Sequence, residues 1–136
     1  MLGDLNILRM IVWTGSGVLL LCLLMYIDAL FTRYKDMEEI KRGNLAVTTR
    51  FVMKLFAQGY ILAQSLSISN DLITGLLVSV ISFVLLFVVE KLVEFSVKSF
   101  AGLELDKGTQ EGKVAHALFS GSLHITGAFI IAACLL

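Results

Sequence analysis

Hydrophobic residues are gathered in four stretches of the chain, each long enough to cross a membrane as a helix. We expect the first from about Met10 to Ile27, the second from Asn44 to Leu66, the third from Leu72 to Val89 and the fourth from Lys113 to Leu136. An α-helix rises about 1.5 Å per residue, so about 20 residues cross the hydrocarbon layer. The pattern therefore predicts an all-α fold: a polytopic membrane protein with four transmembrane helices.

The second stretch differs from the others because it carries a polar face. Arg50, Lys54 and Gln58 stand four residues apart, so they lie on one side of a helix, and Gln64 returns close to the same side. A lone charge in the middle of the hydrocarbon costs about 3 kcal/mol or more. We therefore expect this face to turn away from lipid, toward other helices or water.

Charged linkers follow the first and third stretches, which end at Asp28 and Glu90. In each linker, apolar residues recur at helical spacing among polar ones, which predicts that the helix continues past the membrane as an amphipathic projection. Near the end of the second linker, residues 101–112 hold three glycines among charged side chains. This composition predicts a solvated turn.

The same order of features occurs twice. Each unit consists of an apolar stretch, an acid, an amphipathic linker and a second apolar stretch that begins with Gly-x-x-Ala. The two units cover residues about 7–66 and about 72–136. Since each unit crosses the membrane twice, both copies face the same way, which predicts two parallel two-helix repeats in a single integral membrane domain, residues 1–136. The repeated motif comprises Gly43, Asn44 and Ala46 in the first unit and Gly112 and Ala115 in the second.

Positive charge is concentrated on one side of the predicted membrane region. The linkers at 28–43 and 90–113 hold eight Lys and Arg residues, whereas the opposite side has only Arg9. Because basic loops tend to stay in the cytoplasm, we expect cytoplasmic linkers, both termini outside, and a location in the bacterial cytoplasmic (inner) membrane. The eight residues are Arg33, Lys35, Lys41, Arg42, Lys91, Lys98, Lys107 and Lys113.

Composition supports the same class of protein. Of the 136 residues, 57% are hydrophobic and 16% are charged, and the formal net charge is zero. These values indicate the lipid bilayer as a partner and argue against nucleic acid. Cys22 and Cys134 both lie within apolar stretches, which argues against a disulfide framework.

The Gly43-Asn44-x-Ala46 start of the second stretch, after a short charged linker, resembles the YjfL-type family of small bacterial inner-membrane proteins. That family is a domain of unknown function built from two two-span units. The resemblance covers most of the chain and implies four helices, an inner-membrane location and work in a complex, with no established activity. Lys113 stands where the family pattern favours asparagine.

Arg50 lies near the cytoplasmic end of the second stretch, close to the expected depth of Asp28 and Glu90. We predict an intramembrane ion pair between Arg50 and these two acids. The pair has two interpretations: a structural contact that fixes helix packing, or a gate whose breaking opens a cytoplasmic entrance.

Deeper polar residues form a second candidate set, in which Lys54 has no acid expected at its depth. These residues have two interpretations. They are either hydrogen-bonded packing residues, or they form a path for protons or a solute, because histidine titrates near neutral pH. The two histidines of the set are about 12 Å apart along one helix, too far to share a metal on their own, and we expect no cofactor. The predicted polar path consists of Lys54, Gln58, Gln64, His116, Ser120 and His124.

Sequence motifs for nucleophilic, metal-dependent or nucleotide-dependent catalysis are missing, so we expect a protein that is not an enzyme. Two functions remain open. The first is an inner-membrane subunit that forms a homo-oligomer or docks a membrane-complex partner through its helix faces and cytoplasmic linkers. The second is a small oligomeric channel or proton-coupled carrier that uses the polar faces of the second and fourth stretches.

Overall fold

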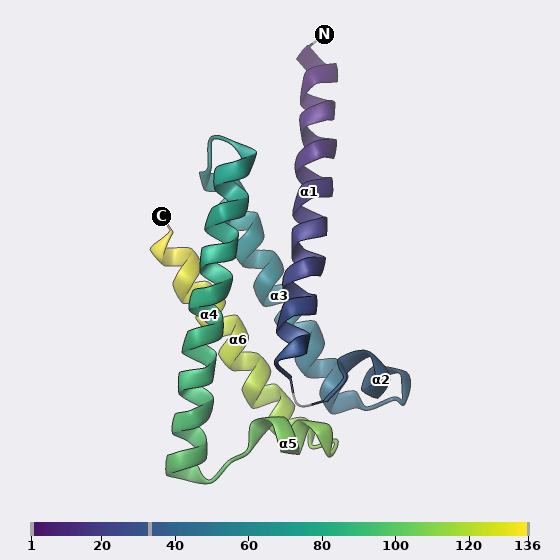
Figure 1. Cartoon of the computed structure of the whole chain (residues 1–136), viewed down its shortest axis with the longest axis vertical. Helices are drawn as coiled ribbons and strands as arrows, with labels where there is room; N and C mark the ends of the chain where they lie inside the picture. Colours follow the sequence, from purple (N-terminus) through teal and green to yellow (C-terminus); the bar gives the residue numbers. More distant parts are fainter. Residues whose placement is uncertain (1, 33, 136) are drawn as a thin grey trace.

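The computed structural model describes residues 2–32 and 34–135, which form helices joined by short turns (Figure 1). The predicted all-α fold is confirmed for this part of the chain. Met1 and Leu136, the ends of the predicted domain, and Arg33 of the first linker lie outside the described residues. The helices are α1 (Leu2–Leu30), α2 (Asp36–Lys41), α3 (Leu45–Ile68), α4 (Leu72–Ala101), α5 (Leu105–Gln110) and α6 (Val114–Cys134).

Three helices of the described chain are long and apolar enough to cross a membrane. They are the part of α1 from Asn6 to Leu30, the whole of α4 and the whole of α6. α3 has 24 residues, which is also enough to span, but its polar residues lower the mean hydropathy of the helix.

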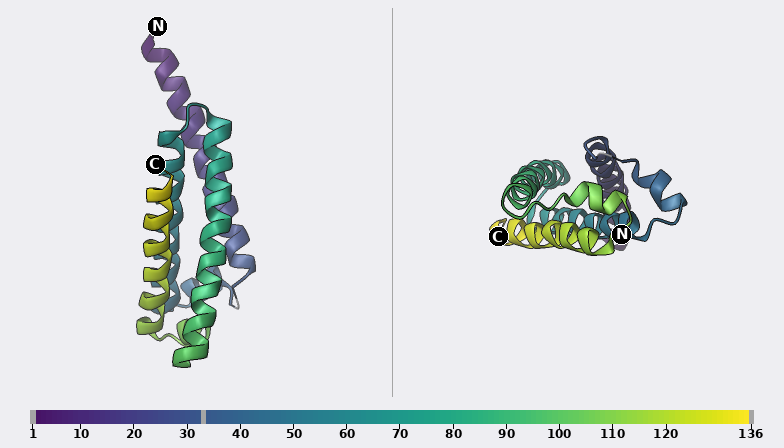
Figure 2. Two further views of the ribbon diagram at one scale, coloured as in Figure 1. Left: turned by 90° about the vertical axis from the view of Figure 1, so that its left-hand side faces the viewer. Right: turned by 90° about the horizontal axis from the view of Figure 1, so that it is seen from below.

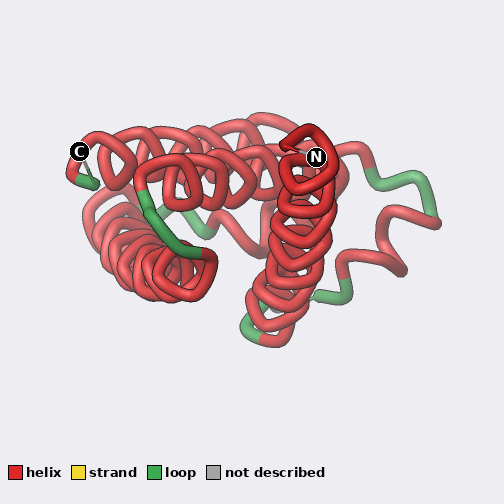
Figure 3. The backbone as a smooth tube through the Cα atoms, turned by 90° about the horizontal axis from the view of Figure 1, so that it is seen from above, coloured by secondary structure: helices red, strands yellow, loops and turns green. Residues whose placement is uncertain are grey.

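The four long helices form two layers (Figure 2). α3 and α6 run in the same direction and pack along one another more extensively than any other pair. α1 and α4 lie on one face of this α3–α6 layer, and no other described segment covers the opposite, bare face (Figure 3). The short helices α2 and α5 lie at one end of the molecule, and the turn between α3 and α4 lies at the other.

The starts of α3 and α6 share one local geometry: a six-residue helix, a glycine with positive φ, and then the long helix. Gly43 has φ 82° and Gly112 has φ 87°, a left-handed conformation that residues with a Cβ rarely adopt. The Asn44 side chain caps α3 by accepting a hydrogen bond from the Val47 backbone amide at 3.2 Å. Its amide nitrogen also donates to the Gln110 carbonyl at 3.0 Å, so the first motif contacts the end of α5.

The first linker does not fold as the sequence predicts. α1 ends at Leu30, and the chain then turns before α2 begins at Asp36. The predicted continuous projection after the first span is therefore wrong. Tyr34, which lies between the two helices, has a buried side chain.

The second linker is helical over more of its length than predicted. α4 continues past Glu90 as expected and ends where Gly102 adopts φ 67°. The predicted solvated turn at 101–112 is wrong, because α5 forms there and packs against α6. Leu105 and Thr109 stand one helical turn apart and are both buried, which gives this short segment an inward face.

α3 turns its polar side into the bundle, as the sequence predicts. Arg50 and Lys54 are 3% and 5% exposed, whereas Phe56 on the opposite side is 67% exposed. Polar groups therefore occupy the interior of the bundle.

Gly121 of α6 permits the close approach of the two central helices, because a Cβ at this position would overlap the Met53 side chain of α3.

A buried acid–base network as the candidate functional site

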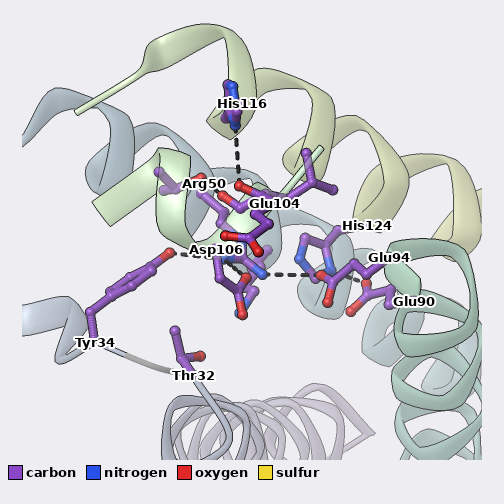
Figure 4. Close-up of polar contacts among 12 residues, drawn as sticks. Thr32, Tyr34, Arg50, Glu90, Glu94, Glu104, Asp106, His116 and His124 are labelled. Atoms are coloured by element: carbon purple, nitrogen blue, oxygen red, sulfur yellow. Dashed lines mark hydrogen bonds and ion pairs between the residues drawn. The ribbon is translucent and has the colours of Figure 1, made fainter. Parts of the chain in front are cut away.

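Arg50 joins three segments at the end of the bundle near α5 (Figure 4). Its Nη1 atom donates to Asp106 of α5 at 2.5 Å and to the Tyr34 hydroxyl at 2.9 Å. Its Nη2 atom pairs with Glu94 of α4 at 3.3 Å. A guanidinium has a planar set of donors, so a single side chain can hold several acceptors in fixed directions.

The predicted partners of Arg50 were Asp28 and Glu90, and this assignment is wrong. α4 continues beyond Glu90, so Glu94, one turn further along the same face, reaches Arg50 instead. The folding of α5 back over the bundle supplies Asp106, which the sequence placed in a solvated turn. The spacing of Glu90 and Glu94 was visible in the sequence, but no sequence signal placed Asp106.

Lys54 has an acid at its depth, contrary to prediction. The Lys54 ammonium lies 2.5 Å from the Asp28 carboxylate, and the two side chains are 6% and 13% exposed. α1 remains helical through this acid and lies against α3 at this level. Asp28 therefore neutralises Lys54, not Arg50.

Glu90 pairs with His124 of α6. The Nδ1 atom of the imidazole contacts the Glu90 carboxylate, and both residues are buried. Asp28–Lys54 joins α1 to α3, and Glu90–His124 joins α4 to α6, so each predicted repeat contains one acid–base contact between its two long helices.

The interior beside these pairs contains polar atoms without a partner among the described residues. They are the Nε atom of Arg50, the Nε2 atom of His124, Oε1 of Gln58 and the hydroxyls of Ser79 and Ser120. Buried polar atoms normally have hydrogen-bond partners, which can be ordered water. These groups, on α3, α4 and α6, are therefore candidates for internal hydration.

The predicted polar path divides into two parts in the structure. Lys54, Gln58, Ser120 and His124 are all buried in the interior. His116 lies at the edge, where its Nδ1 atom is 3.3 Å from the Glu104 carbonyl and its ring covers Gly108. Gln64 is half-buried near the α3–α4 turn.

Acidic groups outnumber basic ones in this network. Arg50, Lys54 and Lys91, which pairs with Glu94 at 3.5 Å, supply three positive charges. The four carboxylates are those of Asp28, Glu90, Glu94 and Asp106. The Asp36 carboxyl, on which the charges of Lys54 and Arg50 act, is a fifth acidic group near them.

Two groups at the linker end have pKa values shifted by burial. Burial raises the pKa of Tyr34 to about 12, so its hydroxyl stays protonated at neutral pH while it accepts the hydrogen bond from Arg50. Burial also raises the pKa of the Asp36 carboxyl, although the charges of Lys54 and Arg50 oppose that shift.

Replacing Asp36 with asparagine should stabilise the protein in detergent at pH 7. The raised pKa means that the ionised carboxylate is less favourable in the folded state than in the unfolded chain. This gain in stability should shrink as the pH falls through the pKa of Asp36 in the folded protein, and it should vanish near the ordinary Asp pKa of 3.8. Thermal unfolding across this pH range measures it, and an unchanged or lowered midpoint at pH 7 contradicts the prediction.

Asp71 provides a control of opposite sign for this measurement. It is exposed, and hydrogen bonds from Thr74 lower the pKa of its carboxyl. Its contribution to stability is therefore present above the ordinary Asp pKa and lost as the pH falls through the folded value. Asp71→Asn should not stabilise the protein at pH 7.

Within residues 2–32 and 34–135, no three His, Cys, Asp or Glu side chains gather closely enough to hold a metal ion. The network consists of paired charges, and what it can do chemically is bind, hold or transfer protons.

Comparisons with known proteins place this structure in a family of membrane proteins. The chain is 29% identical over 119 residues to UPF0719 transmembrane protein YshE of Bacillus subtilis (strain 168), which covers 86% of this chain and 87% of that protein. No solved structure matches the chain. The predicted membership of an uncharacterised membrane family is confirmed. The narrower assignment to the YjfL-type family stays a prediction. Because the family model matches residues 1–135, the chain belongs to the family described as Domain of Unknown Function (DUF350).

Proposed function

We propose that α3 is a fourth membrane span beside α1, α4 and α6. The side of α3 that would meet lipid is apolar, with Leu45, Val52 and Phe56 exposed. Its charged residues are covered by neighbouring helices, where they meet acids instead of acyl chains. The polar residues that reduce the mean hydropathy of this helix are therefore no obstacle to its insertion.

The four spans would form two parallel two-helix repeats in the inner membrane, with both linkers cytoplasmic and both termini outside. Three observations support this arrangement: α2 and α5 lie at one end of the molecule, α3 and α6 begin with the same glycine geometry, and each pair of spans contains an acid–base contact. Cysteine accessibility labelling from each side of the membrane tests the orientation.

We infer that the protein has no enzymatic activity and conducts protons, or couples them to a solute, through the buried network. The observation that carries this function is the Glu90–His124 pair, which lies inside the bundle with one imidazole nitrogen unpartnered among the described residues. Histidine can accept a proton at one ring nitrogen and release one from the other. Ser120 and Gln58 offer further polar atoms in the same interior, which water could connect.

Proton flux into vesicles tests this function. The full chain is reconstituted with a pH-sensitive dye inside and a potassium-driven potential. We expect uptake by the wild type and uptake at the level of empty vesicles for His124→Gln and Glu90→Gln. His116→Gln is the matched control, because this histidine lies on the same helix but outside the interior, and it should conduct normally.

The proton function is rejected if the wild type does not differ from empty vesicles. It is also rejected if both interior variants conduct as the wild type does. Thermal unfolding in detergent shows whether each variant is folded, and only folded variants are compared.

A second candidate function is assembly, as a homo-oligomer or as the subunit of a membrane complex. Two observations favour it: the bare face of the α3–α6 layer (Figure 3), and a groove of about 250 Å³ lined by α3 and α6, in which Tyr60 packs edge-on against Phe129. The native mass in lipid nanodiscs measures assembly directly. A monomeric mass together with proton flux would favour conduction by a single chain.

A further inference from the structure

A groove of about 500 Å³ lies between α1, α2 and α3. This volume falls in the range of about 300–1,000 Å³ that small-molecule sites occupy. Apolar side chains line most of it, and two charged residues, Lys35 and Asp36, stand at the α2 end. The other lining residues are Leu21, Cys22, Met25, Tyr26, Ala29, Leu30, Met37, Phe51 and Leu55.

The two charged residues differ in environment. The Lys35 side chain is 80% exposed, and its ion pair with Glu38 is long, at 3.7 Å. Asp36 is 8% exposed and contributes to the groove wall. Both residues line the α2 end of the apolar groove, where the Lys35 side chain is exposed and Asp36 is buried.

We propose that the groove binds a phospholipid with a primary ammonium in its headgroup, seating one acyl chain between α1 and α3. The phosphate would face the Lys35 ammonium, and the headgroup ammonium would face the Asp36 carboxylate. This charge pattern matches a zwitterionic lipid, whose phosphate and ammonium are joined by a short linker. It does not match a purely anionic lipid, because the headgroup would then face a carboxylate.

The dimensions and surroundings of the groove fit this ligand. From Leu21 to Leu30 the α1 helix rises about 13 Å, enough to line a large part of an acyl chain. An unfilled apolar groove lacks contacts on one side, which an acyl chain would restore. The proposal rests on α3 lying in the bilayer and is independent of proton conduction.

Native mass spectrometry of the full chain tests lipid binding. The protein is released from nanodiscs with equal parts of phosphatidylethanolamine, phosphatidylglycerol and phosphatidylcholine. We expect one retained phosphatidylethanolamine, in preference to phosphatidylcholine, because the quaternary ammonium of the latter has no N–H to donate. Asp36→Asn should lower that preference about tenfold, as expected for the loss of a charge-assisted hydrogen bond.

Two free cysteines supply a matched pair of variants. Cys22 lines the groove, whereas Cys134 is exposed at the end of α6, away from it. Cys22→Phe should fill the groove and abolish lipid retention, and Cys134→Phe should retain the lipid. Lys35→Gln, a surface change that leaves the packing intact, should also reduce retention.

Three results would overturn the proposal. They are retention of all three headgroups alike, retention by folded Cys22→Phe equal to that of the wild type, and a dimer that Cys22→Phe dissociates. The last result would assign the groove to a second copy of the chain. Because the readout is bound lipid mass, its failure leaves the proton-flux result unaffected.

Discussion

Replacing Asp28 with alanine is expected to lower the free energy of unfolding in detergent by about 3–5 kcal/mol, the usual cost of breaking a buried ion pair. The variant leaves the Lys54 ammonium, 6% exposed, without the carboxylate that lies 2.5 Å away. Chemical denaturation monitored by circular dichroism measures the loss. The double variant Asp28→Leu with Lys54→Met should recover most of it, because both charges are then absent.

Glu38→Ala is the control for Asp28→Ala. It removes the exposed Lys35–Glu38 pair, whose side chains are 80% and 58% exposed. Surface pairs contribute about 0–1 kcal/mol, so this variant should hardly change stability. Equal effects of Asp28→Ala and Glu38→Ala would show that the buried pair does not contribute as proposed.

Replacing Arg50 with methionine is expected to release α5 from the bundle. Asp106 would lose a contact of 2.5 Å to the guanidinium, and Tyr34 would lose one of 2.9 Å. Hydrogen bonds to charged groups contribute about 1.5–3 kcal/mol each, so amide exchange across Leu105–Gln110 should accelerate about 10- to 100-fold. Hydrogen exchange with mass spectrometry measures this segment directly.

Two further variants determine what the Arg50 contacts contribute. Arg50→Lys retains the charge but not the planar donors, so exchange in α5 should be intermediate. Lys98→Met is the control, because it removes an exposed pair with Glu104 at 3.7 Å, next to the same helix. Unchanged exchange in Arg50→Met would contradict the structural interpretation. A rise in proton flux in that variant would favour the gate.

The partner assignments show where sequence reasoning stops. Helical periodicity gives the angular position of a side chain around its own helix, and it placed Arg50, Lys54 and Gln58 on one inward face. It does not give the axial offset between two helices. Arg50 was therefore matched with Asp28 by counting from the ends of the apolar stretches, whereas Asp28 lies against Lys54.

α5 illustrates a second limit of sequence analysis. Its six residues are too few to form a stable helix alone, since isolated short helices are marginal in water. Tertiary contacts with α6 that bury Leu105 and Thr109 stabilise it. Glycines and charges in this segment predicted a turn, because composition does not report the neighbour against which a short segment packs.

The sequence by itself determined the class of this protein, its long helices and the inward direction of the polar face of α3, because those properties follow from hydrophobicity and periodicity along one chain. Only the tertiary structure decided which acid meets which base. That choice depends on the axial offsets of α1, α4 and α6 against α3, which are set by contacts such as Gly121 against Met53 between residues far apart in sequence.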